Sequence, residues 1–187
     1  MYDPTLQLET RNLLLRPPCL ADLDRWAECM ADPAVATPLG GVQARPLVWR
    51  ALATAVGAWT LTGCAMFSVI DRRSGLWIGR LGPWQPEGWP GPEVGWALRR
   101  EFWGRGYATE GSIAAIDWAF ATLGWTEVIH CIAADNAASQ GVARRLGSTR
   151  LRQQRLPPPL EQHEVDIWGQ TRAQWLAQRD RLPLRAP

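Results

Sequence analysis

Two glycines lie where the sequence changes from a short apolar segment to a long amphipathic one, and they are well placed to bind a ligand. Gly104 and Gly106 follow the strand-like run Glu93–Arg99 and precede a helix that closes at Gly124. Glycines at such a turn let main-chain N–H groups approach a ligand, and the first helical turn leaves N–H donors unpaired. Together with the positive end of the helix dipole, this arrangement suits a pyrophosphate group.

The turn has one alternative interpretation, and two related phosphate-binding motifs are ruled out. A turn that only joins a strand to a helix also needs glycine, so the Gly-Arg-Gly sequence by itself leaves a structural role open. The three-glycine pattern of dinucleotide-binding folds is absent, and the lysine-bearing phosphate loop is excluded because all 20 basic residues are Arg. Arg99, Arg100 and Arg105 add positive charge around the turn.

The segment around these glycines resembles the acetyl-CoA-binding core of the GNAT N-acetyltransferases. The sequence of Trp103–Glu110 is WGRGYATE, and the family signature Gln/Arg-x-x-Gly-x-Gly/Ala falls on Trp103–Ala108. Trp103 departs from the polar first position, so we expect no phosphate contact from its side chain. The particular branch that the chain resembles contains the ribosomal-protein N-terminal acetyltransferases. The resemblance covers about residues 7 to 170 and includes Leu8–Arg16, Ile78–Trp96 and Asn136–Gly147.

This resemblance implies a fold and an activity. The fold is α/β and GNAT-like, with a mixed, mostly antiparallel central sheet that is splayed between its fourth and fifth strands and flanked by helices. Those two strands are Glu93–Arg99 and Thr126–Ala133. The activity is that of an acetyl-CoA-dependent N-acetyltransferase, which transfers the acetyl group to an amine by direct attack in a ternary complex. The acceptor is expected to be an α-amine of a protein, a peptide or a small molecule.

The resemblance also implies which residues contact the coenzyme. The backbone of Leu98 and Arg99 is expected to pair with the pantetheine arm, as in strand addition, and a strand N–H near Ala97 or Leu98 to polarise the thioester carbonyl. The N–H groups from Arg105 through Thr109 are expected to hold the pyrophosphate. The expected acetyl-CoA-binding residues are Leu98, Arg99, Gly104, Arg105, Gly106, Tyr107, Ala108, Thr109, Asn136 and Ser139.

Two residues are candidates for proton transfer. Glu93 begins the strand that would carry the acetyl group, and related enzymes often place a carboxylate there as general base; the alternative is a solvated charge or a partner for an Arg. The family's usual acid is a tyrosine on the helix after the fifth strand, and no tyrosine is present there. Ser139 could take the acid role or only hydrogen-bond to pantetheine or its own helix. Weaker carboxylate candidates are Glu87, Glu161 and Glu164.

A second function class stays open, a non-catalytic acyl-CoA-binding sensor or scaffold. The glycine turn fits both classes, whereas the missing tyrosine favours the binding module and Glu93 favours the enzyme. The two histidines have no ligand spacing, so we expect no catalytic metal. His130 is expected to be packed in the interior and His163 to lie at the surface. Trp84 and Trp89, in a Pro- and Gly-rich segment, are predicted to form part of a binding surface.

The composition fits one domain over residues 1 to 187, with a core over about residues 7 to 170 and a tail at residues 182 to 187. A net charge of +2 gives no electrostatic footprint for nucleic acid. No segment has the pattern of a signal peptide or the length of a membrane span, so we expect a cytoplasmic protein with no membrane partner. The 4 cysteines form no CxxC pair and are expected to be buried reduced thiols. Both a monomer and a homodimer remain open.

Hydrophobic spacing and turn residues predict the remaining elements. The predicted strands are Gln7–Arg16, Cys64–Asp71, Leu76–Leu81, Glu93–Arg99, Thr126–Ala133, Ser148–Arg155 and Glu164–Trp168. The predicted helices run from Asp22 to Met30, from Pro46 to Gly63, from the glycine turn to Gly124, from Asn136 to Leu146 and from Arg172 to Arg181. The second helix is expected to bury Trp49, Leu52, Val56 and Trp59, and Pro83–Pro92 is expected to be a loop.

Overall fold

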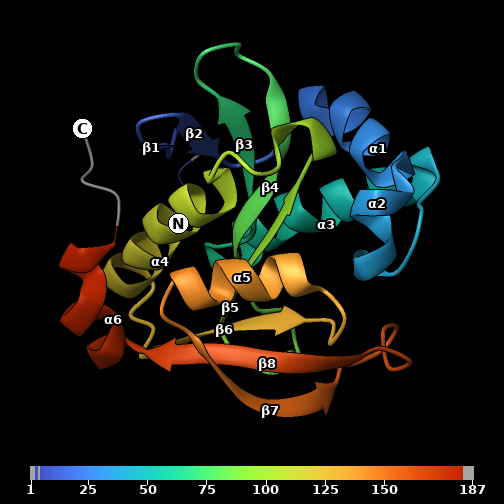
Figure 1. The fold of residues 1–187 in the computed structure, drawn as a ribbon. Helices are drawn as coiled ribbons and strands as arrows, with labels where there is room; N and C mark the ends of the chain where they lie inside the picture. Colours follow the sequence, from blue (N-terminus) through green and yellow to red (C-terminus); the bar gives the residue numbers. More distant parts are fainter. Residues whose placement is uncertain (1–2, 4, 183–187) are drawn as a thin grey trace.

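The structure is a computed structural model that describes residue 3 and residues 5 to 182, and its centre is one eight-stranded sheet (Figure 1). The strands are β1 (Leu8–Glu9), β2 (Leu13–Arg16), β3 (Phe67–Asp71), β4 (Trp77–Trp84), β5 (Glu93–Leu98), β6 (Glu127–Ile132), β7 (Thr149–Arg155) and β8 (Glu164–Thr171). Their order is β1-β2-β3-β4-β5-β6-β8-β7, and each neighbouring pair is antiparallel except β5 and β6. The predicted α/β class with a mixed, mostly antiparallel sheet is confirmed.

Helices cover both faces of this sheet (Figure 1). They are α1 (Leu23–Ala31), α2 (Pro33–Ala36), α3 (Arg45–Thr62), α4 (Tyr107–Thr122), α5 (Ala137–Arg145) and α6 (Arg172–Gln178). A Cβ added at Gly111 of α4 would lie 3.0 Å from the Leu81 side chain, so the glycine lets α4 pack closely on β4. Side chains alternate along a strand, so Arg80 points to the opposite face. There its guanidinium lies 5.4 Å from the centre of the Trp26 ring of α1.

The first predicted strand needs correction, because Gln7–Arg16 forms a hairpin of β1 and β2 rather than one strand. Glu110 of α4 holds the turn between the two. Its carboxylate accepts a hydrogen bond of 2.6 Å from Thr10 Oγ1 and one of 2.7 Å from the Asn12 N–H. A partner so distant in the sequence is outside the reach of local strand propensity.

The predicted loop Pro83–Pro92 also needs correction, because β4 continues to Trp84. Pro83 pairs with Val94 of β5, although proline is rare inside sheets. The last pair between β3 and β4 is Phe67 with Leu81. Beyond that pair β4 has no neighbour on the β3 side, so a residue without an N–H is tolerated there and Trp84 is held in the sheet.

The buried face of α3 differs from the predicted one. Leu52 and Trp59 are buried as expected, but Trp49 and Val56 are 53% and 37% exposed. The buried residues of this helix are Val48, Leu52, Ala55 and Trp59. Because apolar residues surround most of this helix, spacing alone does not select the face that packs.

The cysteine prediction is right in one part and wrong in another. All 4 cysteines are free thiols, but only Cys29 is buried, whereas Cys19 is exposed and Cys64 and Cys131 are half-buried. The short helix α2 was not predicted. The predicted tail lies outside the described residues except for Leu182.

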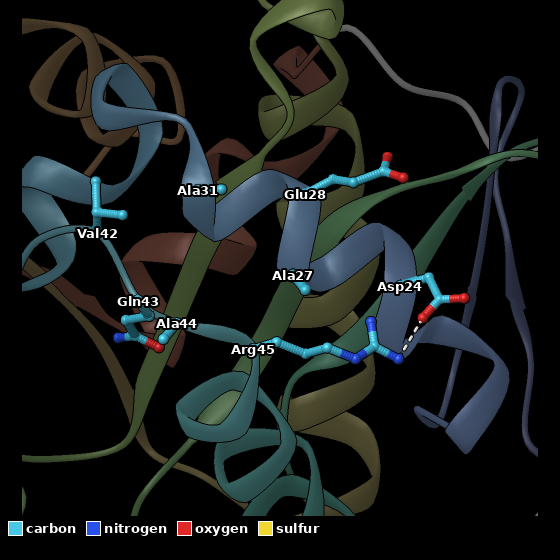
Figure 2. A pocket seen from close by; sticks show the side chains of 8 residues that line it. All are labelled: Asp24, Ala27, Glu28, Ala31, Val42, Gln43, Ala44 and Arg45. Atoms are coloured by element: carbon cyan, nitrogen blue, oxygen red, sulfur yellow. Dashed lines mark ion pairs between the residues drawn. The ribbon is translucent and has the colours of Figure 1, made fainter.

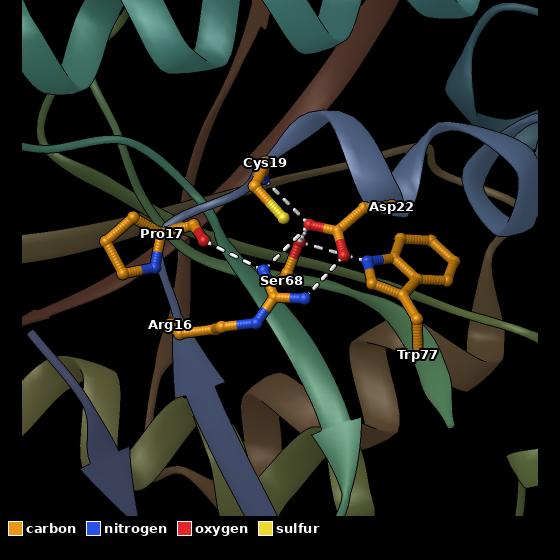
Figure 3. A network of polar contacts seen from close by, with 6 residues as sticks. All are labelled: Arg16, Pro17, Cys19, Asp22, Ser68 and Trp77. Atoms are coloured by element: carbon orange, nitrogen blue, oxygen red, sulfur yellow. Dashed lines mark hydrogen bonds and ion pairs between the residues drawn. The ribbon is translucent and has the colours of Figure 1, made fainter. Parts of the chain in front are cut away.

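A buried polar network fixes the start of α1 against the sheet (Figure 3). The Asp22 carboxylate accepts hydrogen bonds from Arg16 at 2.5 and 2.9 Å, from the Cys19 N–H at 2.9 Å and from Ser68 Oγ at 2.7 Å. Burial opposes ionisation of Asp22, but these hydrogen bonds outweigh it and hold its pKa below the ordinary value. The network joins β2, β3 and α1, and so positions the helix that covers Arg80.

Candidate active site

The glycine turn has the backbone that the sequence predicts. Gly104 and Gly106 have φ angles of +73° and +81°, in the left-handed region that disfavours other residues. Gly106 is the N-cap of α4, whose first turn contains Tyr107, Ala108 and Thr109. A Cβ added at either glycine would meet no atom within 4 Å, so the space next to the turn is open. The unpaired N–H groups of the first helical turn therefore face a surface that a phosphate can reach.

The side chains of this turn have structural partners. The Tyr107 hydroxyl lies 3.3 Å from the Asp71 carboxylate, and Thr109 Oγ1 accepts a hydrogen bond of 3.3 Å from Arg145 Nε. Arg105 is exposed, with its guanidinium 5.0 Å from the centre of the Phe102 ring. The backbone of the turn is thus the part best suited to bind phosphate, with Arg105 and Arg145 supplying positive charge beside it.

At the end of β5, one predicted contact group, the Leu98 N–H, is directed away from β4, whereas the Arg99 N–H is hydrogen-bonded within the sheet. The Arg99 N–H donates to the Ile78 C=O at 2.8 Å, and the Arg99 C=O accepts from the Phe102 N–H at 3.0 Å. The Leu98 C=O accepts from Trp103 Nε1 at 2.8 Å. Because N–H groups alternate along a strand, those of Ala97 and Arg99 face β4, and that of Leu98 faces away from it. Among the predicted groups, the Leu98 N–H is therefore the one directed to the side of β6.

β5 and β6 are parallel, and the ladder between them has a single register pair, Glu93 with Ile129. In an evenly spaced parallel ladder the next bond would join the Cys131 N–H to the Val94 C=O. Instead, the Cys131 N–H donates to the Glu93 carboxylate at 3.0 Å, and the Val94 C=O accepts from His130 Nδ1 at 2.6 Å. Side chains thus replace main-chain pairing between the two strands for which the sequence predicts a splay.

Glu93 is buried where this ladder stops, with 6% of its surface exposed. Besides the Cys131 N–H, its carboxylate accepts a hydrogen bond of 2.7 Å from Trp89 Nε1. Burial raises the pKa of Glu93, and the hydrogen bonds and the nearby charge of Arg80 offset only part of that effect. The strand start is therefore neither solvated nor ion-paired, and it holds a carboxylate with an increased affinity for a proton.

His130 is packed in the interior, as predicted, with 1% of its surface exposed. Because the Val94 C=O can only accept, Nδ1 carries the ring proton, and Nε2 accepts from Ser148 Oγ at 3.0 Å. Burial lowers the pKa of His130 to about 4, so the ring is neutral at neutral pH. Both nitrogens are used, and this histidine has a structural role.

Ser139 lies on the other side of β5 from Glu93. The Asn136 side chain caps α5 by accepting from the Ser139 N–H at 3.0 Å, at the predicted start of this helix. The Ser139 hydroxyl accepts a hydrogen bond of 3.3 Å from Trp96 Nε1. Glu93 and Trp96 are an odd number of positions apart on one strand, so they point to opposite faces of the sheet. The two predicted proton-transfer residues therefore flank β5 from its two sides.

Arg80 was not among the predicted site residues, and it lies on the same face of the sheet as Glu93, with the Gly82–Gly95 pair between them. The signal was available, since Arg80 is the only charged residue within an apolar strand. Trp84 and Trp89 are half-buried. Trp84 lines a cavity with Arg80 and pairs with Glu93, and Trp89 donates to Glu93 as described. The remaining carboxylate candidates, Glu87, Glu161 and Glu164, are all exposed.

A groove of about 820 Å³ lies between α1 and the segment before α3 (Figure 2). Its charged lining residues are Asp24, Glu28 and Arg45, and a 2.5 Å ion pair joins Arg45 to Asp24. None of its lining residues is a predicted site residue, although Glu28 also pairs with Arg99 at 3.1 Å. The predicted site residues thus lie around β5 and outside this groove.

Over the described ranges, 3 and 5 to 182, no cluster of His, Cys, Asp and Glu side chains has the arrangement of a metal site. Within the same ranges, none of the helices combines the length and apolarity needed to cross a bilayer.

Comparison with known proteins places these features in a family context. A family model described as an acetyltransferase (GNAT) domain matches residues 12–149. Over 89 residues, 45% of this chain and 37% of the relative, the sequence is 36% identical to FsC-acetyl coenzyme A-N(2)-transacetylase of Aspergillus fumigatus. The matches span 37% and 51% of the length of two curated relatives.

Two solved structures illustrate the similarity in fold. The crystal structure of an acetyltransferase from Agrobacterium tumefaciens has a TM-score of 0.78 and 29% identity, over 92% of this chain and 98% of that one. Mycobacterium smegmatis RimJ, solved in complex with CoA-disulfide, has a TM-score of 0.71 and 15% identity, over 94% of this chain and 91% of that one. At this level of identity, the second similarity concerns the fold.

Proposed function

The chain belongs to the GNAT acetyltransferase domain family, and we propose that it is an acetyl-CoA-dependent N-acetyltransferase that acts on a cytoplasmic amine without a metal. The observation that carries this proposal is the open, left-handed Gly104–Gly106 turn at the start of α4, next to the edge of β5 where pairing with β6 stops. The curated relative from Aspergillus is named as an acetyl coenzyme A-N(2)-transacetylase, which agrees with an amine acceptor.

In this proposal the coenzyme binds mainly through main-chain groups. The N–H groups from Arg105 through Thr109 hold the pyrophosphate at the positive end of α4. The Leu98 N–H, directed away from β4, lies along the path of the pantetheine arm and is the candidate to stabilise the developing oxyanion. Asn136 and Ser139, at the start of α5, also contact the pantetheine arm.

Proton transfer in the proposed reaction uses the two faces of β5. The amine nitrogen attacks the carbonyl carbon of the thioester, the carbon–sulfur bond breaks, and the sulfur leaves as a thiolate. Glu93 receives the proton of the amine, directly or through a water molecule, and its raised pKa suits a group that must hold that proton. Ser139, or a water molecule beside it, supplies a proton to the thiolate.

We propose an α-amine acceptor rather than a lysine side chain. A lysine ammonium has a pKa of about 10.4 and an α-ammonium about 7.7 to 8.0, so far more of the α-amine is neutral near pH 7.5. The chain has one buried base and no tyrosine beside α5, so an amine that is already close to neutral suits its residues better. The resemblance to the N-terminal acetyltransferase branch agrees with this choice.

The choice of amine can be tested on two forms of one molecule. Nε-formyl-lysine offers only its α-amine, and Nα-formyl-lysine offers only its ε-amine. The free carboxylate raises the pKa of this α-ammonium above the roughly 7.7 to 8.0 of a chain terminus but leaves it below that of the ε-ammonium, so we expect acetylation of the first to exceed that of the second by about tenfold near pH 7.5. The measurement is acetylated product by mass spectrometry. Preferential acetylation of Nα-formyl-lysine would contradict the α-amine proposal.

The second candidate, a non-catalytic acyl-CoA-binding module, is favoured by one observation. Tyr107, the one tyrosine among the described residues, has its hydroxyl beside Asp71, so it does not replace the missing acid on α5. This module would bind acetyl-CoA at the same turn without turnover. Either a monomer or a homodimer is compatible with both candidates.

A further inference from the structure

A cavity of about 170 Å³ lies on the face of the sheet that carries Glu93. Its lining residues are Trp26, Ala51, Thr54, Ala55, Met66, Arg80 and Trp84. Two indole rings and a methionine make it largely apolar, and Thr54 is exposed, so the cavity reaches the surface there. It is smaller than the roughly 300 to 1,000 Å³ of sites for drug-sized ligands, and so suits a group of about one amino acid.

Arg80 is the one charged residue of this cavity, and its charge has no counter-ion among the described residues. Its Nε is buried without a hydrogen-bond partner. Its Nη1 donates only to the Met66 sulfur, at 3.5 Å, which is a weak acceptor. The Trp26 ring, 5.4 Å from the guanidinium, compensates part of the burial. Arg80 as a whole is half-buried, but a buried donor atom without a partner is costly, so the unpaired Nε needs an explanation.

Glu93 is the nearest candidate for that anion, but its carboxylate is committed elsewhere. It accepts from Trp89 and from the Cys131 N–H, and it forms no ion pair with Arg80. Burial lowers the pKa of Arg80, and the charge of Glu93 offsets only part of that effect. Because Arg80 lines the cavity and no hydrogen bond among the described residues engages its Nη2, the guanidinium keeps a donor for an anionic group.

The register places this cavity next to the proposed reaction centre. Arg80 pairs with Ala97 and Trp84 pairs with Glu93, so all four lie on one face of neighbouring strands. Between these pairs, Gly82 pairs with Gly95, and a Cβ added at Gly95 would lie 2.7 Å from the Met66 methyl group and 3.3 Å from the Glu93 carboxylate. Met66 thus lies between the cavity that it lines and Glu93, and a ligand that binds Arg80 reaches Glu93 when this flexible side chain moves aside.

We propose that this cavity selects the acceptor, and that the acceptor is a small amine bearing a carboxylate and an apolar body, the chemistry of an apolar α-amino acid. The carboxylate pairs with Arg80, whose planar guanidinium matches its geometry. The apolar body packs against Trp26, Trp84 and Met66, and the amine is directed toward Glu93. This assignment rests on the proposed acetyltransferase function, since it names the substrate class of the same site.

Pairing with Arg80 also helps the reaction. A free carboxylate near an ammonium stabilises the charged form and raises the pKa of the amine. When the guanidinium neutralises that carboxylate, this stabilisation of the ammonium is removed. The amine therefore reaches its reactive neutral form more readily in the cavity than in water.

The test presents L-phenylalanine and L-phenylalaninamide to the protein as acetyl acceptors and measures the acetylated product. The amide has no carboxylate, and its amine is easier to deprotonate, so intrinsic reactivity favours the amide. We expect the opposite preference, with the KM of the amino acid at least about tenfold lower, as for a charged hydrogen-bonded pair. In Arg80→Gln, the KM for the amino acid should rise by about ten- to a hundredfold while the KM for acetyl-CoA stays within about twofold.

Two variants control for folding and for general charge. Arg80→Lys retains the positive charge but loses the planar donors, and we expect it to restore part of the affinity. Arg50→Gln removes an exposed arginine of α3 close to Thr54, and we expect it to leave the preference unchanged. Thermal unfolding of each variant shows whether it is folded, and the comparison within the wild-type protein needs no variant.

The experiment can contradict the role of the cavity without contradicting the proposed acetyltransferase function. Equal or better transfer to the amide, unchanged in Arg80→Gln, would overturn the inference and leave the acetyltransferase proposal intact. If the folded wild-type protein acetylates neither compound nor any other amine, calorimetric titration of L-phenylalanine into the CoA-saturated protein decides the matter. Binding that is lost in Arg80→Gln then supports the cavity assignment, and absence of binding overturns it.

Discussion

The Glu93 carboxylate occupies the point where main-chain pairing between β5 and β6 stops, and it accepts the N–H that the ladder would otherwise bond. A second donor, Trp89 Nε1, holds the carboxylate in place. Burial raises its pKa despite both contacts. Glu93 thus replaces a main-chain hydrogen bond between the two strands, and it is also a base with an increased proton affinity near the side of β5 where the thioester is expected. Its mutation therefore has to be tested separately for its effect on turnover and for its effect on coenzyme binding.

We predict that Glu93→Gln lowers kcat by about 100- to 10,000-fold, the usual range for loss of a general base, with little change in the Kd for acetyl-CoA. The two donors bind different carboxylate oxygens and glutamine retains an acceptor for only one of them, so thermal unfolding first establishes that the variant is folded. Steady-state kinetics and calorimetry measure the two quantities. Glu87→Gln, in the exposed loop nearby, is the matched control and should keep wild-type turnover.

The pH profile gives an independent reading of the same residue. A base works only when ionised, so kcat/KM falls as the pH drops through its pKa. Because burial raises that pKa, this acid limb should lie above the ordinary carboxylate value of 4.5, and it should vanish in Glu93→Gln. An unchanged profile with wild-type turnover in the variant would assign Glu93 to sheet structure alone.

At the scale of elements, the glycine turn and the first turn of α4 form one unit. Gly104 and Gly106 hold left-handed conformations, and within the described part of the chain no atom beyond their chain neighbours lies within 4 Å of a Cβ added at either. The sequence predicted this unit well, because glycine spacing and helix periodicity are local properties. The end of β4 and the packed face of α3 were less predictable, because they depend on where β3 stops and on which neighbour α3 meets.

We predict that Gly106→Val weakens acetyl-CoA binding by at least about 1 kcal/mol, or about fivefold in Kd, because a β-branched side chain both strains the backbone and fills the phosphate approach. Gly124→Val is the matched control. Gly124 follows the other end of α4, has a φ of +67° and also has no atom within 4 Å of an added Cβ. Both variants should lose stability, but only Gly106→Val should lose affinity in calorimetric titration. Equal affinities for the two folded variants would remove the pyrophosphate from this turn.

At the scale of the molecule, β5 forms the parallel junction of the sheet with β6, and helices cover both faces of the sheet (Figure 1). The proposed site lies along the side of β5 that faces β6. The fold class and the glycine turn could be predicted from sequence, because the motif and the periodicity are local. The contacts of Glu93 with Trp89 and Cys131, and the lack of a counter-ion for Arg80, could not. They depend on strand register and on side chains that meet only in the folded sheet.

The proposed acetyl transfer is tested most directly in a mixture of the protein, acetyl-CoA and a panel of amino acids and other small amines. Free CoA thiol and acetylated product are measured together. We predict amine-dependent thiol release above the rate without protein, with one thiol formed for each acetylated amine. Calorimetry on the same preparation establishes that acetyl-CoA is bound. Firm binding of acetyl-CoA, with no release of CoA thiol in the presence of any of the amines, would contradict the proposed acetyl transfer and identify the chain as an acyl-CoA-binding module.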